Sequence, residues 1–359
     1  MRKQTFRKHI TTGGLAAVLF AALLFGGACP KKAPPAPPPA PARPPVPMYD
    51  LTFNLEQGKT YACNLIFKRN VTITGGPERM DAPPPLEAVV GMDWQVAKNA
   101  GPQDKDIKIS MTIKSLSFSM GGPGRPLQPE VLAKLMGSQL EMTVSPSGEI
   151  KSFTGLDLQF QDLEQDKALF RKNEGALIPL RLQLSDEPLK NALALAFNFA
   201  PGKDKSAAAA KNSRAAMMSV MKKTGDTWDK PAVDVDALGG MVPVALKYKL
   251  DKLKQGTDFA FVLFGGSGDV SGQQEAVADA VGGLLPPRAR RNATVEMTGM
   301  DVRGYVVFNT KEKDLEEVKA RISSKIKISS QGRRKGSSME ADVEIVREAV
   351  LSLSQKAEK

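Results

Sequence analysis

The sequence predicts a β-rich α+β fold: curved antiparallel sheet in two related halves, with a helical segment inserted between them. Long stretches alternate apolar and polar residues, and short turns rich in glycine and proline separate them. The middle of the chain changes to a helical period. The opening Gly-Lys-Thr-Tyr at 58–61 is echoed by Gly-Asp-Thr-Trp at 225–228, which suggests an internal duplication.

Residues 1–28 have the plan of a bacterial signal peptide. Four basic residues precede an apolar run over 14–25, and the small residues 26–28 follow it. The run is about 12 residues long, whereas a helix needs about 20 to span a bilayer. We therefore expect a cleaved signal, and a permanent transmembrane helix is the alternative.

Cys29 directly follows Gly26-Gly27-Ala28. This stretch resembles the lipobox of bacterial lipoproteins, in which the cysteine receives a diacylglycerol and becomes the new N-terminus. The resemblance implies that Cys29 is lipidated and holds the protein on a membrane. Ordinary signal cleavage is the alternative, since Gly26 occupies the place where the lipobox prefers leucine.

Residues 29–47 form a predicted proline-rich tether. Ten of the 18 residues from Pro30 to Pro47 are proline, which fixes φ and removes the amide donor. An extended polyproline II segment of this length would reach roughly 55 Å. Pro30, and not aspartate, follows the cysteine; by analogy with enterobacterial sorting, this favours the outer membrane, facing the periplasm.

The N-terminal β-rich half is expected to cover 48–156. Its apolar register slips by one residue near Lys114, which predicts a β-bulge there. Alternating strands of this length predict an antiparallel sheet with one solvated face. We expect strands beginning near 60, 86, 107 and 140 and a short helix over 129–136.

A helical connection is expected over 157–223. Asp186 and Glu187 place acids in the first turn of one helix, with Pro188 near its start. The predicted helices cover 161–171, 186–199 and 203–223.

The C-terminal β-rich half is expected to cover 224–355. Its strands follow the same order as those of the N-terminal half, so that 246–250 corresponds to 92–96 and 259–263 to 107–113. This matched order supports the duplication. Further strands are expected over 294–297, 304–308, 318–328 and 339–353.

Composition excludes several kinds of site. The only histidine, His9, lies in the signal, so the mature chain has no Ser-His-Asp or Cys-His catalysis and no histidine metal ligand. Cys63 is the only cysteine of the body and is expected to be a buried structural thiol. The signal carries four basic and no acidic residues, so the charge falls from +11 to +7 on cleavage, too little to indicate nucleic-acid binding.

Three motifs suggest chemistry, and each has a simpler structural reading. Residues 264–269 lack the Gly-Lys-Ser/Thr ending of a phosphate loop and are expected to form a flexible turn. Ser324 and Lys327 are three apart in a strand, so they point to opposite faces. Asp234 and Asp236 could suggest a cation site, but two acids without further oxygen ligands are more often helix caps or solvated charges. We expect no catalytic, cofactor or metal site, and no enzyme.

The body resembles a group of uncharacterised bacterial envelope lipoproteins built on a domain of unknown function. The resemblance rests on Cys29 and on the stretches 55–61, 145–150 and 225–228 with the strands that follow. It implies an antiparallel β-rich body with helices and assigns no activity.

Two functions fit these features. Fourteen methionines remain after signal cleavage, and methionine-rich strand faces suit either an ordinary core or a cavity for an apolar ligand such as a lipid. Our first hypothesis is a tethered, non-enzymatic binder of an apolar ligand. The alternatives are a structural or assembly module that contacts other envelope proteins, and a histidine-free hydrolase.

Overall fold

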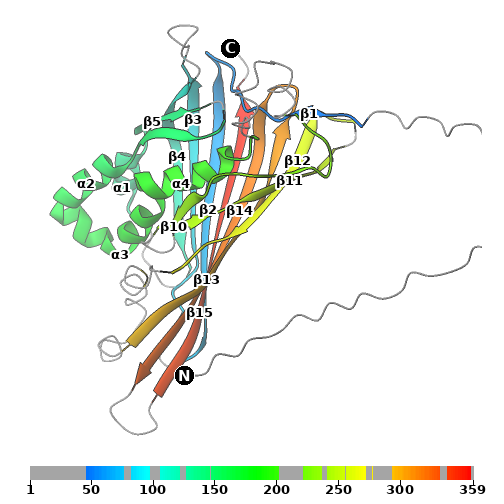
Figure 1. Cartoon of the computed structure of the whole chain (residues 1–359). Helices are drawn as coiled ribbons and strands as arrows, with labels where there is room; N and C mark the ends of the chain where they lie inside the picture. The colour runs from blue at the N-terminus through cyan, green and yellow to red at the C-terminus, as the bar shows by residue number, and fades with distance from the viewer. Residues whose placement is uncertain are drawn as a thin grey trace, which may run out of the picture. The chain divides into compact units, whose positions relative to one another are not determined.

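An eleven-stranded antiparallel sheet dominates the protein (Figure 1), which confirms the predicted β-rich α+β fold. Cys29, the predicted signal and the tether up to Pro45 lie outside the described residues. The computed structural model describes residues 46–76, 82–97, 106–121, 127–145, 147–201, 221–236, 241–254, 256–271, 277, 293–331 and 338–356.

The strand order of the large sheet is β6-β5-β4-β3-β2-β15-β14-β13-β12-β11-β8. Its strands are β2 (Thr60–Gly75), β3 (Leu86–Val96), β4 (Ile107–Met120), β5 (Gln139–Val144), β6 (Ile150–Thr154), β8 (Thr227–Asp229), β11 (Lys247–Leu253), β12 (Phe259–Ser267), β13 (Ala293–Asn309), β14 (Asp314–Gln331) and β15 (Ser338–Gln355). Two small pairs lie outside it, β1 (Tyr49–Asp50) with β7 (Met221–Lys222), and β9 (Val233–Asp236) with β10 (Met241–Val244). The helices are α1 (Pro129–Leu135), α2 (Asp157–Gln165), α3 (Lys167–Leu184) and α4 (Asp186–Phe197).

The first and last long strands of the body are neighbours in the centre of the sheet. β2 and β15 pair from Tyr61 opposite Gln355 to Gly75 opposite Ala341. The two predicted β-rich segments therefore contribute their strands to one continuous sheet. No local property of either strand indicates this pairing, because it joins residues far apart in the sequence.

The two faces of the sheet differ as the alternation predicts. One face is apolar and buried, with Leu65, Val318 and Leu351 each 3% exposed or less. The other carries ion pairs between neighbouring strands, such as Lys319 with Glu348 at 3.7 Å and Lys327 with Glu340 at 3.7 Å. The charged face is solvated, and the apolar face is the core.

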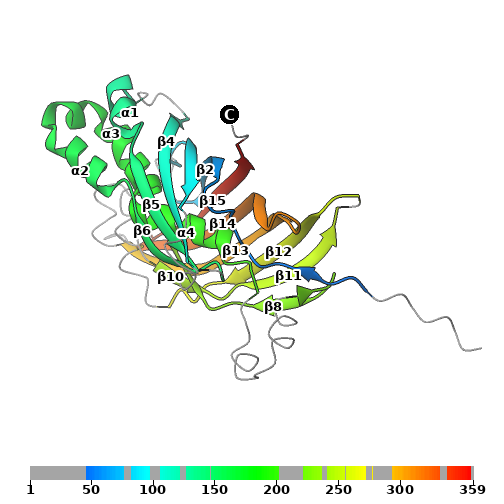
Figure 2. The ribbon, with the colours of Figure 1, turned by 90° about the horizontal axis from the view of Figure 1, so that it is seen from above.

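The sheet curves around α4 (Figure 2). This helix contacts both β6 and β14, which are the first and seventh strands of the sheet. Six strand spacings in a flat sheet would separate them by about 29 Å, more than one helix can bridge. The contacts therefore require the curvature that the sequence predicts.

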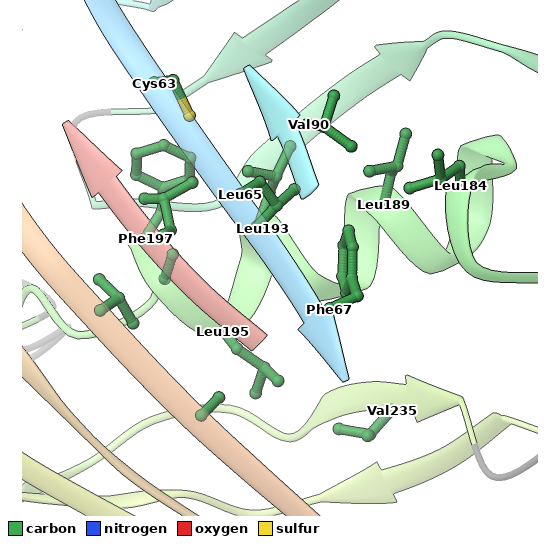
Figure 3. Close-up of a cluster of buried hydrophobic side chains, with 14 of the residues drawn as sticks. Cys63, Leu65, Phe67, Val90, Leu184, Leu189, Leu193, Leu195, Phe197 and Val235 are labelled. Carbon is green, nitrogen blue, oxygen red and sulfur yellow. The ribbon is translucent and has the colours of Figure 1, made fainter. Parts of the chain in front are cut away.

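Side chains of α4 pack with those of β2 and β3 in a buried hydrophobic cluster (Figure 3). The ring of Phe197 lies 4.9 Å from that of Phe53 and 5.9 Å from that of Trp94, measured between centroids. Leu189 and Leu193 of the same helix are buried beside them. The predicted start of this helix, with acids in its first turn, is confirmed.

The two glycine-threonine openings make the same backbone contacts. The amide of Gly58 donates to the carbonyl of Val96 at 2.9 Å, and that of Gly225 donates to Leu250 at 2.7 Å. The aromatic residues that follow also correspond, because Tyr61 lies opposite Trp94 and Trp228 opposite Tyr248. This local repetition agrees with the predicted duplication.

The predicted bulge is also found. Ser115 lies opposite Gly91 while Ile113 lies opposite the next residue, Met92, so Lys114 is the extra residue in β4. The slip in the hydrophobic pattern predicted a bulge near Lys114 and Ser115, because one inserted residue exchanges the two faces of a strand.

The expectation of a flexible turn at 264–269 is wrong for most of its length. Gly265, Gly266 and Ser267 continue β12. A β-carbon at Gly266 would overlap the carbonyl oxygen of Ala245, so a glycine here allows a close approach of two backbones. Sequence alone does not separate this use of glycine from its use in turns.

Two predicted helices have different bounds. The stretch 161–171 belongs to α2 and α3, and α3 continues to Leu184 with Pro179 inside it. Burial of Leu177 and Leu180 against the core outweighs the helix-breaking tendency of proline. Of the helix predicted over 203–223, residues 203–220 lie outside the described part of the chain, and Met221–Lys222 form β7 instead.

Candidate ligand-binding cleft

A small apolar cleft lies between the end of α3, α4 and the core face of the sheet. Its cavity volume is about 50 Å³. The sheet contributes Phe67 from β2, Ile322 from β14 and Ala349 from β15. Opposite them, Pro188, Ala192 and Leu195 of α4, Leu182 of α3 and Val235 of β9 complete the apolar walls.

Regular spacing places these residues together. Phe67 and Ala349 are directly opposed across β2 and β15, so they share a face and are neighbours. Ala192 and Leu195 are three apart in α4 and lie on the same side of that helix. Leu182 is 57% exposed, so the wall it forms also reaches solvent.

An ion pair lines part of the cleft. Nη1 of Arg347 lies 2.6 Å from Oδ2 of Asp236, and the two side chains are 14% and 20% exposed. The Nε and Nη2 atoms of Arg347 are buried and have no hydrogen-bond partner among the described residues. One of the three nitrogen atoms is therefore bonded to Asp236, while the Nε–Nη2 edge of the guanidinium is buried without a hydrogen-bond partner in the described part of the chain.

A second arginine lies beside the first. Arg69 of β2 is directly opposed to Arg347 of β15, on the core face. Burial lowers the pKa of Arg69 from its ordinary value, and the positive charge of Arg347 lowers it further. The Nε atom of Arg69 is also buried without a hydrogen-bond partner in the described part of the chain.

A larger and more polar cleft of about 380 Å³ lies on the other side of α4. Lys230, which is 9% exposed, donates from Nζ to the carbonyl of Ser147 at 3.0 Å. Burial lowers the pKa of Lys230 to about 8, against the opposing effect of Glu149. Its lining mixes lysines with the acids Glu149, Glu187 and Asp234, so the charges do not converge on one kind of ligand.

The residues singled out from sequence behave largely as their structural readings predict. Cys63 is 1% exposed and is a free thiol. Ser324 is fully buried whereas Lys327 points to the charged face, which confirms that the two are not partners. Asp236 pairs with an arginine, and the described residues contain no cluster of acids, cysteines or histidines able to hold a metal ion. The lipidation site Cys29 lies outside the described residues.

The arginine pair was missed in the sequence, although a signal for it exists. In β2, Arg69 stands in the series of alternate positions that are otherwise apolar, between Phe67 and Val71. Arg347 has the same place in β15, between Ile345 and Ala349. A charged residue in the buried phase of an alternating strand requires a partner or a function. Only the pairing of β2 with β15 reveals that the two exceptions meet.

None of the described helices is long and apolar enough to cross a membrane. No protein-family model matches the sequence, and no curated protein matches it. The resemblance to envelope lipoproteins therefore remains a prediction.

Similar arrangements occur in solved structures at low similarity. A structure of lipovitellin, titled for its lipid–protein interactions, matches 85% of this chain and 26% of its own, at 10% identity and a TM-score of 0.42. The outer membrane protein OprG of Pseudomonas aeruginosa matches 85% of this chain and 99% of its own, at 7% identity and a TM-score of 0.19. An outer membrane channel of Pseudomonas putida F1 matches 84% of this chain and 98% of its own, at 9% identity and a TM-score of 0.17. At these low scores, no function is transferred from these proteins.

Proposed function

We propose that the protein is a lipid-anchored envelope protein whose body binds an apolar or amphiphilic ligand without enzymatic turnover. The cleft between α4 and the sheet is the observation that carries this proposal. Its walls are formed mostly by aliphatic and aromatic side chains, and its polar lining residues are Gln183, Asn191, Asp236, Arg347 and Glu348. This arrangement is typical of sites for small apolar molecules.

The size of the cleft limits what enters it in this conformation. A dry cavity of about 150 Å³ holds benzene, so about 50 Å³ admits only the end of a chain. A longer ligand requires α3 and α4 to move away from the sheet. Pro179 removes one backbone hydrogen bond from α3, and Leu182 one turn later is already exposed, so we expect α3 to move first.

The proposed anchor is the acylated Cys29, with the proline-rich tether holding the body away from the membrane. The signal-like stretch before Cys29 and the ten prolines after it support this arrangement. Acyl chains on one cysteine contribute about 0.8 kcal/mol for each buried CH₂ group, enough for stable attachment. We propose the outer membrane, with the body in the periplasm, as the location.

Photo-crosslinking with an apolar probe tests the binding proposal. The full-length protein in lipid nanodiscs would be exposed to an uncharged fatty alcohol that carries a diazirine on its chain. We expect crosslinks in peptides that contain Phe67, Leu182 or Leu195. Ala192→Trp fills the cleft and should abolish those crosslinks.

Leu158→Trp is the matched control, because residue 158 is 69% exposed and distant in sequence from the cleft walls. Circular dichroism of both variants checks that they fold. Crosslinks that scatter over the surface, or that persist in a folded Ala192→Trp variant, would overturn the proposal.

A second candidate is an assembly module that contacts other envelope proteins. Ile178 of α3 is 44% exposed, Leu182 57% and Leu158 of α2 69%, so these two helices present large apolar side chains to solvent. A photoreactive amino acid at position 178 in living cells should then capture a reproducible protein partner. Failure to capture any partner with several crosslinkers would count against this candidate.

A further inference from the structure

The partly buried pair of arginines on the core face is costly unless something binds it. Arg69 and Arg347 are opposed on neighbouring strands, where side chains are close and like charges repel. Buried polar groups left without hydrogen bonds lower the stability of the fold, and charged groups lower it more. The described residues contribute one carboxylate to this pair, that of Asp236.

The open atoms have a specific geometry. In a guanidinium, the Nε–H and one Nη2–H lie on the same edge and point in parallel, which matches the two oxygen atoms of a carboxylate or phosphate. In Arg347 this edge is the one that is buried without a partner, while Nη1 binds Asp236. Asp236 therefore holds the guanidinium in place without occupying its bidentate edge.

The same arginine lines the apolar cleft. We infer that the cleft takes an amphiphile with an anionic oxygen head group, a carboxylate or a phosphate, whose oxygens bind the Nε–Nη2 edge of Arg347 beside the charge of Arg69. The chain of the ligand lies against Phe67, Leu195 and Ile322. This inference rests on the proposed function, because it assigns the head group of the ligand proposed there.

Three ligands that share a twelve-carbon chain and differ in head group distinguish the contribution of the head group to binding from that of the chain. Dodecanoate, dodecyl phosphate and the neutral dodecanol would compete with the diazirine alcohol for crosslinking to the full-length protein in nanodiscs. We expect one or both anions to compete at least about tenfold more strongly than dodecanol. The tighter of the two anions identifies the head group as carboxylate or phosphate.

Substitution of the arginines tests the assigned atoms. Arg347→Gln should remove the preference for anions and leave competition by dodecanol unchanged. Arg303→Gln is the matched control, since Arg303 is exposed on the opposite face of the sheet and should keep the preference. If Arg347→Gln does not fold, Arg69→Gln is the variant to test. Arg69 should contribute part of the preference for anions, and its substitution leaves the ion pair between Arg347 and Asp236 in place.

The outcomes distinguish the two proposals. Equal competition by all three ligands, a preference that survives in a folded Arg347→Gln variant, or a preference that is undiminished in a folded Arg69→Gln variant overturns the anionic head group and leaves apolar binding standing. Absence of crosslinking in the cleft, and of competition by any ligand, overturns both.

Discussion

The guanidinium of Arg347 lies 2.6 Å from the carboxylate of Asp236, and this contact joins β15, in the centre of the sheet, to the β9–β10 pair. Asp236 is the only carboxylate that the described ion pairs place beside the two arginines of the core face. The contact therefore combines a stabilising role with the orientation of a group that faces the cleft.

Asp236→Asn should lower the free energy of unfolding by about 2–4 kcal/mol, because it leaves two buried guanidiniums without that countercharge. Arg347→Gln should cost less, since it also relieves the repulsion from Arg69. Urea unfolding of both variants and the double variant should give a coupling energy of about 1–3 kcal/mol. Asp234→Asn, an exposed acid on the same strand, is the control and should change stability by less than about 0.5 kcal/mol. Additive effects would show that the pair does not interact.

Gly148→Ala should be much more destabilising than Gly137→Ala. Both glycines have the left-handed φ that disfavours other residues, +83° and +81°. A β-carbon at position 137 meets nothing, whereas one at 148 would overlap the carbonyl oxygen of Phe197 at the end of α4. We expect Gly137→Ala to lower the free energy of unfolding by about 1 kcal/mol and Gly148→Ala to lower it by at least about 3 kcal/mol, measured by chemical unfolding. Equal effects would mean that α4 shifts without cost.

Lys230 should make stability depend on pH. Its pKa is about 8 in the fold and 10.5 in the unfolded chain, so the unfolded chain binds more protons between these values and stability rises with pH. The advantage of the wild type over Lys230→Met should grow by about 2–3 kcal/mol from pH 7 to pH 10. Urea unfolding at several pH values measures this difference. Parallel stability curves for the two proteins would contradict the assigned cause.

The Cys63 thiol should be unreactive in the native protein. It is 1% exposed, and burial raises its pKa well above the ordinary value, so the reactive thiolate is scarce. Ellman's reagent should react at least about a hundredfold more slowly with native than with denatured protein. Rapid reaction of the native thiol would show that β2 opens locally.

Cys29→Ala should abolish palmitate labelling and release the protein from the membrane fraction. The anchor is the proposed reason for membrane attachment, and Cys63 is buried and offers no substitute. Cys63→Ala should retain both the label and the attachment. Membrane retention of an unlabelled Cys29→Ala protein would disprove the proposed anchor.

Local patterns predicted the elements that depend on local physics. Alternation identified β2, β3 and β4, and its one-residue slip located the bulge at Lys114. The acids and proline at 186–188 located the start of α4. Prediction failed at Gly266, where glycine serves a close approach to Ala245, and at Pro179, which packing keeps inside a helix.

The sequence by itself determined the fold class, the buried position of Cys63 and the lack of any histidine after His9, because composition and periodicity are properties of single segments. Only the tertiary structure decided that the first and last long strands pair and that one helix contacts strands six positions apart. The candidate site depends on this strand pairing and on these helix contacts. Arg69 and Arg347 meet through the strand pairing, and α4 and the curved sheet together line the cleft beside Arg347, so neither strand alone contains the information that forms the cleft.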